Sequence, residues 1–302
     1  MGSSNYEFDR WKHKSKSSWP LRIFKQHTNE LLRMFIAFNN SKSYTYKNLG
    51  KDNSKWEDKL DKHFKFENKW EYDKFDDLKD WSNGYNELEN WINLNALVSM
   101  SSSFETYIAT IVPLALESDI GVLFGTSHKI DGMSILKYGK NEPFDFNNIV
   151  VGITKGDWNS RVAIYKKTFD NVPKYLESNI SSLEKIRKIR NDLAHAFGRD
   201  IEASRDKFIL KSLPIKKLSR EKFLKYQNII WQSALSIDTH LTNFHIGEYQ
   251  TLLFYHKLFP NLTQTRHQSE RAVRLKKEIG KYGDLPHGKL FCKGLVDYYE
   301  SL

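Results

Sequence analysis

An arginine, an asparagine and a histidine stand within the six residues 190–195, in a segment that reads LEKIRKIRNDLAHAFGRD from position 183. The imidazole of His195, with an ordinary pKa of about 6.5, could exchange protons at neutral pH. The guanidinium of Arg190 stays charged and presents a planar fork of donors to phosphate oxygens. These two groups could cleave RNA without a metal, because the RNA supplies its own 2′-hydroxyl as nucleophile. Asn191 could orient the imidazole or hydrogen-bond the substrate.

Helix geometry limits what one copy of this segment can do. At roughly 100° per residue, Asn191 and His195 share a helix face, whereas Arg190 lies about 140° from His195. One straight helix therefore brings both side chains to one phosphate only with the help of the long arginine stem, and a second copy of the helix would remove the difficulty. Taken alone, the same spacing also fits an Arg-Asn pair that forms salt bridges or caps, and a histidine that is merely exposed.

The arginine, the asparagine directly after it and the histidine five positions on resemble the R-x(4–6)-H motif of the HEPN family, in which Asn, Asp or His typically follows the arginine. The order of predicted helices is similar as well. A long helix carries Phe104-Glu105-Thr106-Tyr107, a helix led by Trp158 follows, and the motif helix precedes a further amphipathic helix. The resemblance covers roughly residues 87–260.

Resemblance to the HEPN nucleases implies a metal-independent endoribonuclease that needs no cofactor and leaves a 2′,3′-cyclic phosphate. It also implies a homodimer in which both motifs line one cleft. The setting that it implies is a toxin–antitoxin pair or an abortive-infection antiphage system, which acts on tRNA or other cellular RNA beside an antitoxin or defence-system partner. Some members keep the fold without cleaving, so the alternative is a non-catalytic HEPN scaffold that binds RNA or a partner protein.

The net charge of +10 favours contact with a polyanion, although excess lysine can also be a solvated surface. A basic cluster follows the motif helix, and we expect it to contact the substrate backbone; its members are Lys211, Lys216, Lys217 and Arg220. A second basic run, over residues 266–281, could track phosphates or form a charged solvated face.

Two other patterns are weaker. His240, His245 and Glu248 could hold a metal in a hydrolase inhibited by EDTA, but their spacing does not fit the H-E-x-x-H arrangement. The run 283–289 matches G-x4-G-K, yet Leu290 replaces the Ser or Thr that a P-loop needs, so we expect a turn. With no convincing metal-ligand set, the attacking group should be the 2′-hydroxyl, which makes RNA rather than DNA the expected substrate.

Helical spacing of apolar residues, without alternating strands, predicts an all-α helical bundle. We expect helices over residues 21–38, 87–117, 158–169, 181–197, 219–244 and 266–281, and residues 249–258 either extend the helix before them or form another. Looser structure with turns or a short insertion is expected over 118–157, where glycines recur. We divide the chain into an N-terminal extension (1–85), a HEPN-like helical domain (86–260) and a basic C-terminal tail (261–302).

A single cysteine, Cys292, excludes an intramolecular disulfide and fits a reducing compartment. The charged N-terminal residues contain no apolar signal segment. The longest apolar stretch, residues 107–116, is far shorter than the roughly 20 residues of a membrane span. We therefore expect a cytoplasmic protein with no membrane association.

Overall fold

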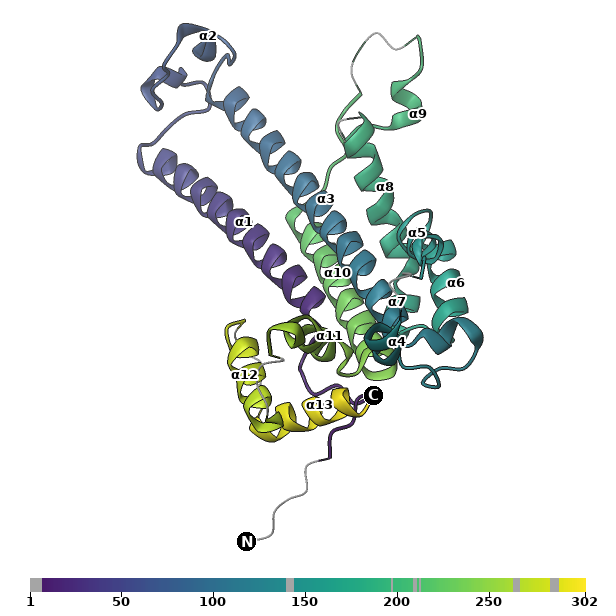
Figure 1. Cartoon of the computed structure of the whole chain (residues 1–302). Helices are drawn as coiled ribbons and strands as arrows, with labels where there is room; N and C mark the ends of the chain where they lie inside the picture. Colours follow the sequence, from purple (N-terminus) through teal and green to yellow (C-terminus); the bar gives the residue numbers. More distant parts are fainter. Residues whose placement is uncertain are drawn as a thin grey trace. The chain divides into compact units, whose positions relative to one another are not determined.

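The computed structural model describes residues 7–139, 144–196, 198–208, 211, 213–262, 267–282 and 288–302. All regular elements in these residues are helices (Figure 1), and the all-α prediction is confirmed. The described ranges contain no strand, only an isolated antiparallel bridge between Asp119 and Asp131.

The chain folds into two compact units, each made of segments that are distant in sequence. Unit 1 combines the chain up to Phe24 with Phe104–Ile180 and the chain from Trp231 onwards, and unit 2 combines Lys25–Ser103 with Ser181–Ile230. The long helices α1 (Trp19–Lys51), α3 (Leu78–Ser118) and α10 (Arg220–Leu241) each contribute several residues to both units. The three-part division at residues 85 and 260 stays a prediction.

Unit 2 contains the motif helix, α8 (Ile180–Ala196), and the short helix α9 (Ile201–Ser204) that follows it. Its core includes Phe35 and Phe223, whose ring centroids lie 4.7 Å apart. Between α1 and α3 the chain forms only η1 (Leu60–Lys62) and α2 (Lys69–Tyr72). There the aromatic rings pack around a small cluster of their own, formed by Leu49, Leu60 and Leu78.

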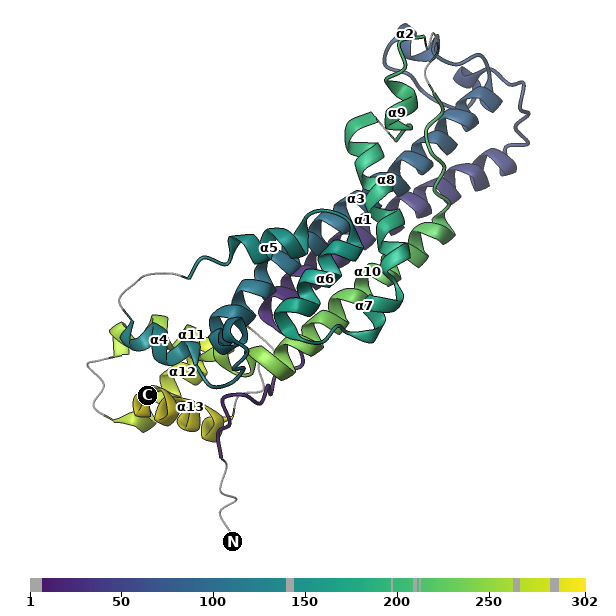
Figure 2. The same cartoon turned by 90° about the vertical axis from the view of Figure 1, so that its right-hand side faces the viewer.

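Unit 1 contains the shorter helices and most of the C-terminal half. Its elements are η2 (Ile120–Phe124), α4 (Gly132–Tyr138), α5 (Asn147–Thr154), α6 (Trp158–Phe169), α7 (Lys174–Ser178), the π-helical turn η3 (Thr242–Ile246), α11 (Tyr249–Leu258), η4 (Phe259–Leu262), α12 (Gln268–Gly280) and α13 (Lys289–Ser301). Helices α12 and α13 lie side by side (Figures 1 and 2). They bury Leu275, Ile279, Leu295 and Val296.

The helices with local sequence signals match the prediction closely. Asp157 caps α6, because its side chain accepts a hydrogen bond from the amide of Ser160 at 3.0 Å. Helix α11 begins and ends where predicted. By contrast, α1 and α3 are longer than predicted, since residues 39–51 and 78–86 are helical without a clear apolar stripe. The looser region 118–157 contains α4 and α5.

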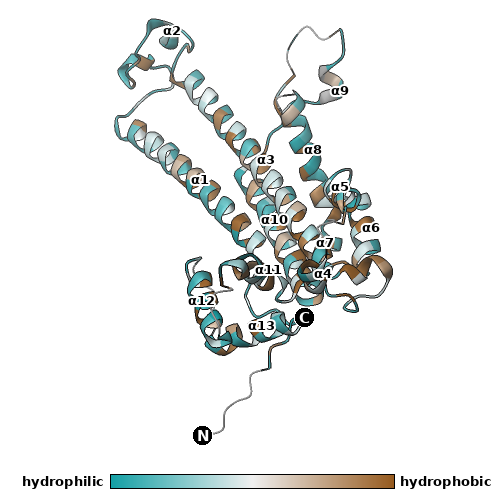
Figure 3. Ribbon diagram, viewed as in Figure 1, coloured by the Kyte–Doolittle hydropathy of each residue, from teal (hydrophilic) through white to brown (hydrophobic). Residues whose placement is uncertain are grey.

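Hydrophilic and hydrophobic residues are interspersed along the long helices (Figure 3). Within the described residues, no helix combines the length and apolar character that crossing a membrane requires. The predicted turn over residues 283–287 lies outside the described residues, and α13 begins at Lys289. The predicted basic helix is confirmed as α12.

Candidate functional site

The motif occupies the last two turns of α8, a regular helix anchored on one side. Leu183 and Ile186 are 1% and 2% exposed, while Ile189 and Leu193 further along are half-buried. On the more polar side, Arg187 binds both carboxylate oxygens of Glu184, one turn earlier, at 2.6–3.1 Å. The buried stripe fixes the rotation of α8 about its axis, and so fixes the direction in which the motif residues leave it.

The chain leaves α8 through Gly198, which has a left-handed backbone (φ +77°). Its amide donates to the carbonyl of Asp192 at 3.1 Å, and its carbonyl accepts from the amide of Lys216 at 2.7 Å. A Cβ on Gly198 would meet Ile215 at 3.0 Å, Leu193 at 3.3 Å and Leu94 at 3.4 Å. Glycine is therefore required here both for its backbone conformation and for the close packing of the returning chain.

The three predicted catalytic residues leave the helix in different environments. His195 is exposed in the last turn, whereas Arg190 and Asn191 are half-buried. The Oδ1 atom of Asn191 accepts a long hydrogen bond of 3.4 Å from Nη1 of Arg190. Asn191 thus contacts the guanidinium, so it can position Arg190 for a phosphate.

Among the predicted phosphate contacts, Lys216 already has a partner on the motif helix. Its Nζ forms an ion pair with the Oδ2 of Asp192. The Lys216 side chain is 43% exposed and that of Asp192 is 14% exposed. A phosphate of RNA would have to compete with Asp192 for this lysine.

The other three predicted cations are exposed and lie in two places. Lys217 and Arg220, the latter at the start of α10, line a groove of about 1250 Å³ within unit 2, whereas Lys211 is not among its described lining. The charged residues of the groove are Arg199, Lys217, Arg220, Glu87, Glu89 and Glu221. Arg190 and His195 are likewise absent from the described lining, so the groove is a neighbour of the motif and not its centre.

Asparagines of α3 hold the chain segment that forms one wall of this groove. Asn90 accepts from the amide of Leu218 at 2.7 Å and donates to the carbonyl of Lys216 at 3.0 Å. Asn93 donates to the carbonyl of Leu218 at 2.9 Å. Neither asparagine was among the residues predicted from the sequence to form the site. The available signal was the recurrence of asparagine at 83, 86, 90 and 93, which puts the four amides on one helix face.

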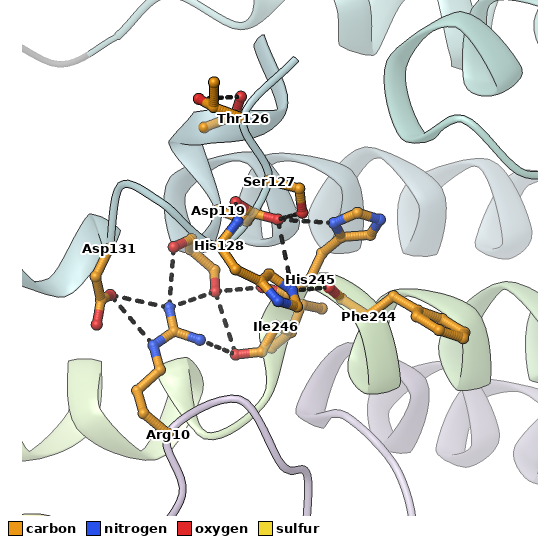
Figure 4. A network of polar contacts seen from close by, with 11 residues as sticks. Arg10, Asp119, Thr126, Ser127, His128, Asp131, Phe244, His245 and Ile246 are labelled. Atoms are coloured by element: carbon orange, nitrogen blue, oxygen red, sulfur yellow. Dashed lines mark hydrogen bonds and ion pairs between the residues drawn. The ribbon is translucent and has the colours of Figure 1, made fainter. Parts of the chain in front are cut away.

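Unit 1 contains a second polar cluster that the sequence did not indicate (Figure 4). Arg10 is 2% exposed and donates to the carbonyl and hydroxyl of Ser118, at 2.9 and 2.8 Å, and to the carbonyl of Ile246 at 2.9 Å. It also pairs with Asp131 at 3.1 Å. Every contact ties the N-terminal segment to the helices around it, so Arg10 acts as a structural clamp.

His245 belongs to the same cluster and is engaged in it. Its Nδ1 lies 3.0 Å from Oδ2 of Asp119, which also accepts from Ser127 at 2.5 Å (Figure 4). Burial alone would raise the pKa of Asp119, but the hydrogen bonds from His245, Ser127 and the amide of His128 hold it below its ordinary value. The cluster is therefore built around an ionised carboxylate that is fully buried and is stabilised by these three hydrogen bonds.

His240 is a neutral neighbour of this cluster. Burial, followed by the nearby His245, lowers the pKa of His240 to about 4. Its Nδ1 lies 2.7 Å from the hydroxyl of Tyr165, whose pKa burial raises well above its ordinary value. The phenol is thus the donor, and His240 the acceptor, near neutral pH.

Two of the three proposed metal ligands, His240 and His245, lie close together, with ring centroids 5.8 Å apart, but Glu248 is engaged elsewhere. Glu248 is buried and accepts from the amide of Lys14 at 2.7 Å and from the hydroxyl of Thr251 at 3.0 Å. In the part of the chain that the structure describes, no group of three or more His, Cys, Asp or Glu side chains is placed to hold a metal ion.

No family model, curated protein or solved structure matches this chain.

Proposed function

We propose that this chain is a metal-independent endoribonuclease of the HEPN type, with Arg190 and His195 as its catalytic residues. The observation that carries the proposal is the state of the motif at the end of α8. An imidazole is exposed in the last turn, and a guanidinium stands beside the amide of Asn191 on the same helix. One group can move protons and the other can bind a phosphate, and both are carried by a helix with a fixed rotation.

In the proposed reaction the 2′-oxygen of RNA attacks the adjacent phosphorus. The O2′–P bond forms and the P–O5′ bond breaks, so the products are a 2′,3′-cyclic phosphate and a 5′-hydroxyl. A neutral imidazole takes the 2′-hydroxyl proton, and an imidazolium gives a proton to the leaving 5′-oxygen. Arg190 stabilises the negative charge that gathers on the phosphorane oxygens.

This proton balance favours a homodimer. The reaction needs a base and an acid at one phosphate, and the motif supplies one histidine per chain. The angular separation of about 140° between Arg190 and His195 on the helix also favours a homodimer. Two motif helices that face one cleft would provide two imidazoles and two guanidinium groups.

The surrounding charge supports a polyanionic substrate. Lys217 and Arg220 are exposed, and the whole chain carries a net charge of +10. Each lysine or arginine that neutralises a phosphate releases counterions, which favours binding at low salt. We further propose a cytoplasmic toxin or antiphage effector that acts on tRNA or another cellular RNA, with an antitoxin or defence-system protein as partner.

Total RNA incubated with the purified full chain in EDTA tests the proposal. We expect cleavage by the wild type, with 2′,3′-cyclic phosphate ends, and none by His195→Ala or Arg190→Ala. Asn191→Ala should lose less, because it positions the arginine. Lys188→Ala removes an exposed charge from the same helix and is the matched control; it should cleave normally.

Three results would overturn the mechanism: wild-type cleavage by His195→Ala, inhibition by EDTA, or equal cleavage of an RNA with a single 2′-deoxy substitution 5′ to the cut. RNA binding without any cleavage would instead identify a non-catalytic scaffold. Light scattering at assay concentration that finds an active monomer would remove the dimer from the proposal.

A further inference from the structure

The groove beside the motif helix has features that the proposed cleavage chemistry does not use. Four asparagines of α3 line it, at positions 83, 86, 90 and 93. Steps of three, four and three residues place them within an arc of about 80° on the helix. A row of amides on one face offers hydrogen-bond donors and acceptors along nearly three turns of the helix.

Two members of the row already bind the donors and acceptors of a neighbouring chain segment. Asn90 pairs in both directions with the backbone of Lys216 and Leu218, at 3.0 and 2.7 Å. The Oδ1 of Asn93, a residue only 2% exposed, has no hydrogen-bond partner in the described structure. A buried acceptor without a donor is uncommon, and a ligand N–H group could supply the missing bond.

The other two members continue the row beyond that segment. Asn83 and Asn86 are both exposed. The Oδ1 of Asn86 accepts from Lys42 at 2.8 Å, and because an amide oxygen has two lone pairs, Asn86 can still both accept from and donate to a ligand.

Equal numbers of basic and acidic residues line the groove, which distinguishes it from a surface that binds a row of phosphates. Arg199, Lys217 and Arg220 face Glu87, Glu89 and Glu221 in the same lining. Carboxylates repel phosphates but accept hydrogen bonds from amino groups. Glu89 is already paired with Lys42 at 2.5 Å, whereas Glu87 and Glu221 are exposed.

The groove and the motif are joined by one short segment. Lys216 contributes its amide to Gly198, just after the motif, and its carbonyl to Asn90 in the groove. Arg199 lines the groove four residues after His195, and its Nε donates to the carbonyl of Leu213 at 2.6 Å. A nucleotide held in the groove would therefore lie on the structure that also supports the end of the motif helix.

We infer that this groove is a base-recognition subsite for single-stranded RNA, and that it prefers bases with an exocyclic amino group, adenine and cytosine, over uracil. The inference rests on the proposed function for its substrate class. Asparagine amides and carboxylates are the side chains that accept from such amino groups, and asparagine can bind adenine through two bonds. At about 1250 Å³ the groove exceeds the roughly 300–1,000 Å³ of a pocket for one drug-sized ligand, so it has room for more than one nucleotide.

Fluorescence anisotropy with labelled ten-nucleotide homopolymers of A, C and U tests the inference. The full chain with His195→Ala serves as background, so that the RNA stays intact. We expect A and C oligomers to bind at least about five-fold tighter than U. A double variant, Asn83→Ala with Asn86→Ala, should remove that preference and change U binding less than about two-fold. Asn40→Ala, an exposed asparagine outside the described groove lining, is the matched control and should keep the preference.

The groove inference and the nuclease proposal fail in different ways. If the double variant folds normally by circular dichroism and keeps the full preference for A and C, the groove does not read bases, even if the wild type cleaves RNA. Equal binding of the three oligomers by the His195→Ala protein would also show that the groove does not read bases. If the double variant abolishes the preference but the wild type cleaves nothing, the groove is confirmed and the nuclease proposal falls.

Discussion

Replacing Gly198 with alanine should destabilise unit 2 and weaken RNA cleavage at the same time. Gly198 ends the motif helix with a left-handed backbone, φ +77°, and its amide and carbonyl connect Asp192 to Lys216. An alanine must either keep this conformation under strain or rotate away from it. Rotation would break both backbone hydrogen bonds and shift the last turn of α8, which carries His195.

The size of the effect follows from two contributions. A non-glycine residue in the left-handed region costs about 1–2 kcal/mol. The new Cβ would also lie 3.0 Å from Cγ2 of Ile215 and 3.3 Å from Cδ1 of Leu193, so at least one side chain must move off its preferred rotamer. That adjustment costs roughly 0.5–1.5 kcal/mol. We expect a total loss of about 2–3 kcal/mol in the free energy of unfolding.

Gly156→Ala separates the two contributions. Gly156 also has a left-handed backbone, φ +89°, but its added Cβ would meet nothing within 4 Å. It should therefore lose only the strain of about 1–2 kcal/mol. Urea unfolding at 25 °C measures both variants, and cleavage assays compare their activity. If Gly198→Ala costs no more than Gly156→Ala, the packing at Gly198 is not as tight as the contacts indicate. Normal cleavage by Gly198→Ala would show that the end of α8 does not position the site.

Three further predictions concern charged groups. Lys216→Met should lower the slope of log affinity for RNA against log salt concentration by about 1, because it removes one phosphate contact. It should cost less than about 1 kcal/mol in the free energy of unfolding, since the ion pair with Asp192 is partly exposed. An unchanged slope would exclude Lys216 from phosphate contact. Arg10→Met should cost about 3–5 kcal/mol, because it removes a buried guanidinium that pairs with Asp131 and donates to Ser118 and Ile246; a smaller cost measured by urea unfolding would contradict this. Because the pKa of His240 is about 4 in the folded chain against 6.5 ordinarily, its contribution to stability is complete above pH 6.5 and is lost as the pH falls toward 4. After allowance for its partial exposure the loss is on the order of 2 kcal/mol, and thermal melts of His240→Phe should depend less on pH over this interval.

The all-α fold and several helix ends could be predicted because their signals are local. Asp157 begins α6 with a side-chain cap, and Gly198 ends α8 in the backbone conformation that glycine favours. The extra turns of α1 and α3 could not be predicted, since residues 39–51 and 78–86 show no clear apolar stripe. The helical spacing of apolar residues reflects the face of a helix that is buried, so a helix segment that buries few side chains shows little of this spacing.

The candidate site also has one part that could be predicted from the sequence and another that could not. The spacing of Arg190, Asn191 and His195 is a property of one helix and could be read from the sequence. The groove could not be predicted, because it is formed by α3 and a segment more than 120 residues later, which are joined by the hydrogen bond between Asn90 and Lys216. The clamp at Arg10 depends on residues more than 100 positions away, Ser118 among them, and no sequence spacing encodes such a contact.

The pairing of Lys216 with Asp192 shows how these long-range contacts could serve an RNA substrate. With the lysine side chain 43% exposed, the ion pair contributes at most about 1 kcal/mol. The backbone of Lys216 is held separately, by hydrogen bonds to Gly198 and Asn90 that do not involve Nζ. The ammonium group can therefore exchange Asp192 for a phosphate while the segment that supports the motif stays in place. Under the proposed function, Asp192 would hold the ammonium group beside the motif helix until RNA binds, and a phosphate would replace Asp192 at little cost in free energy.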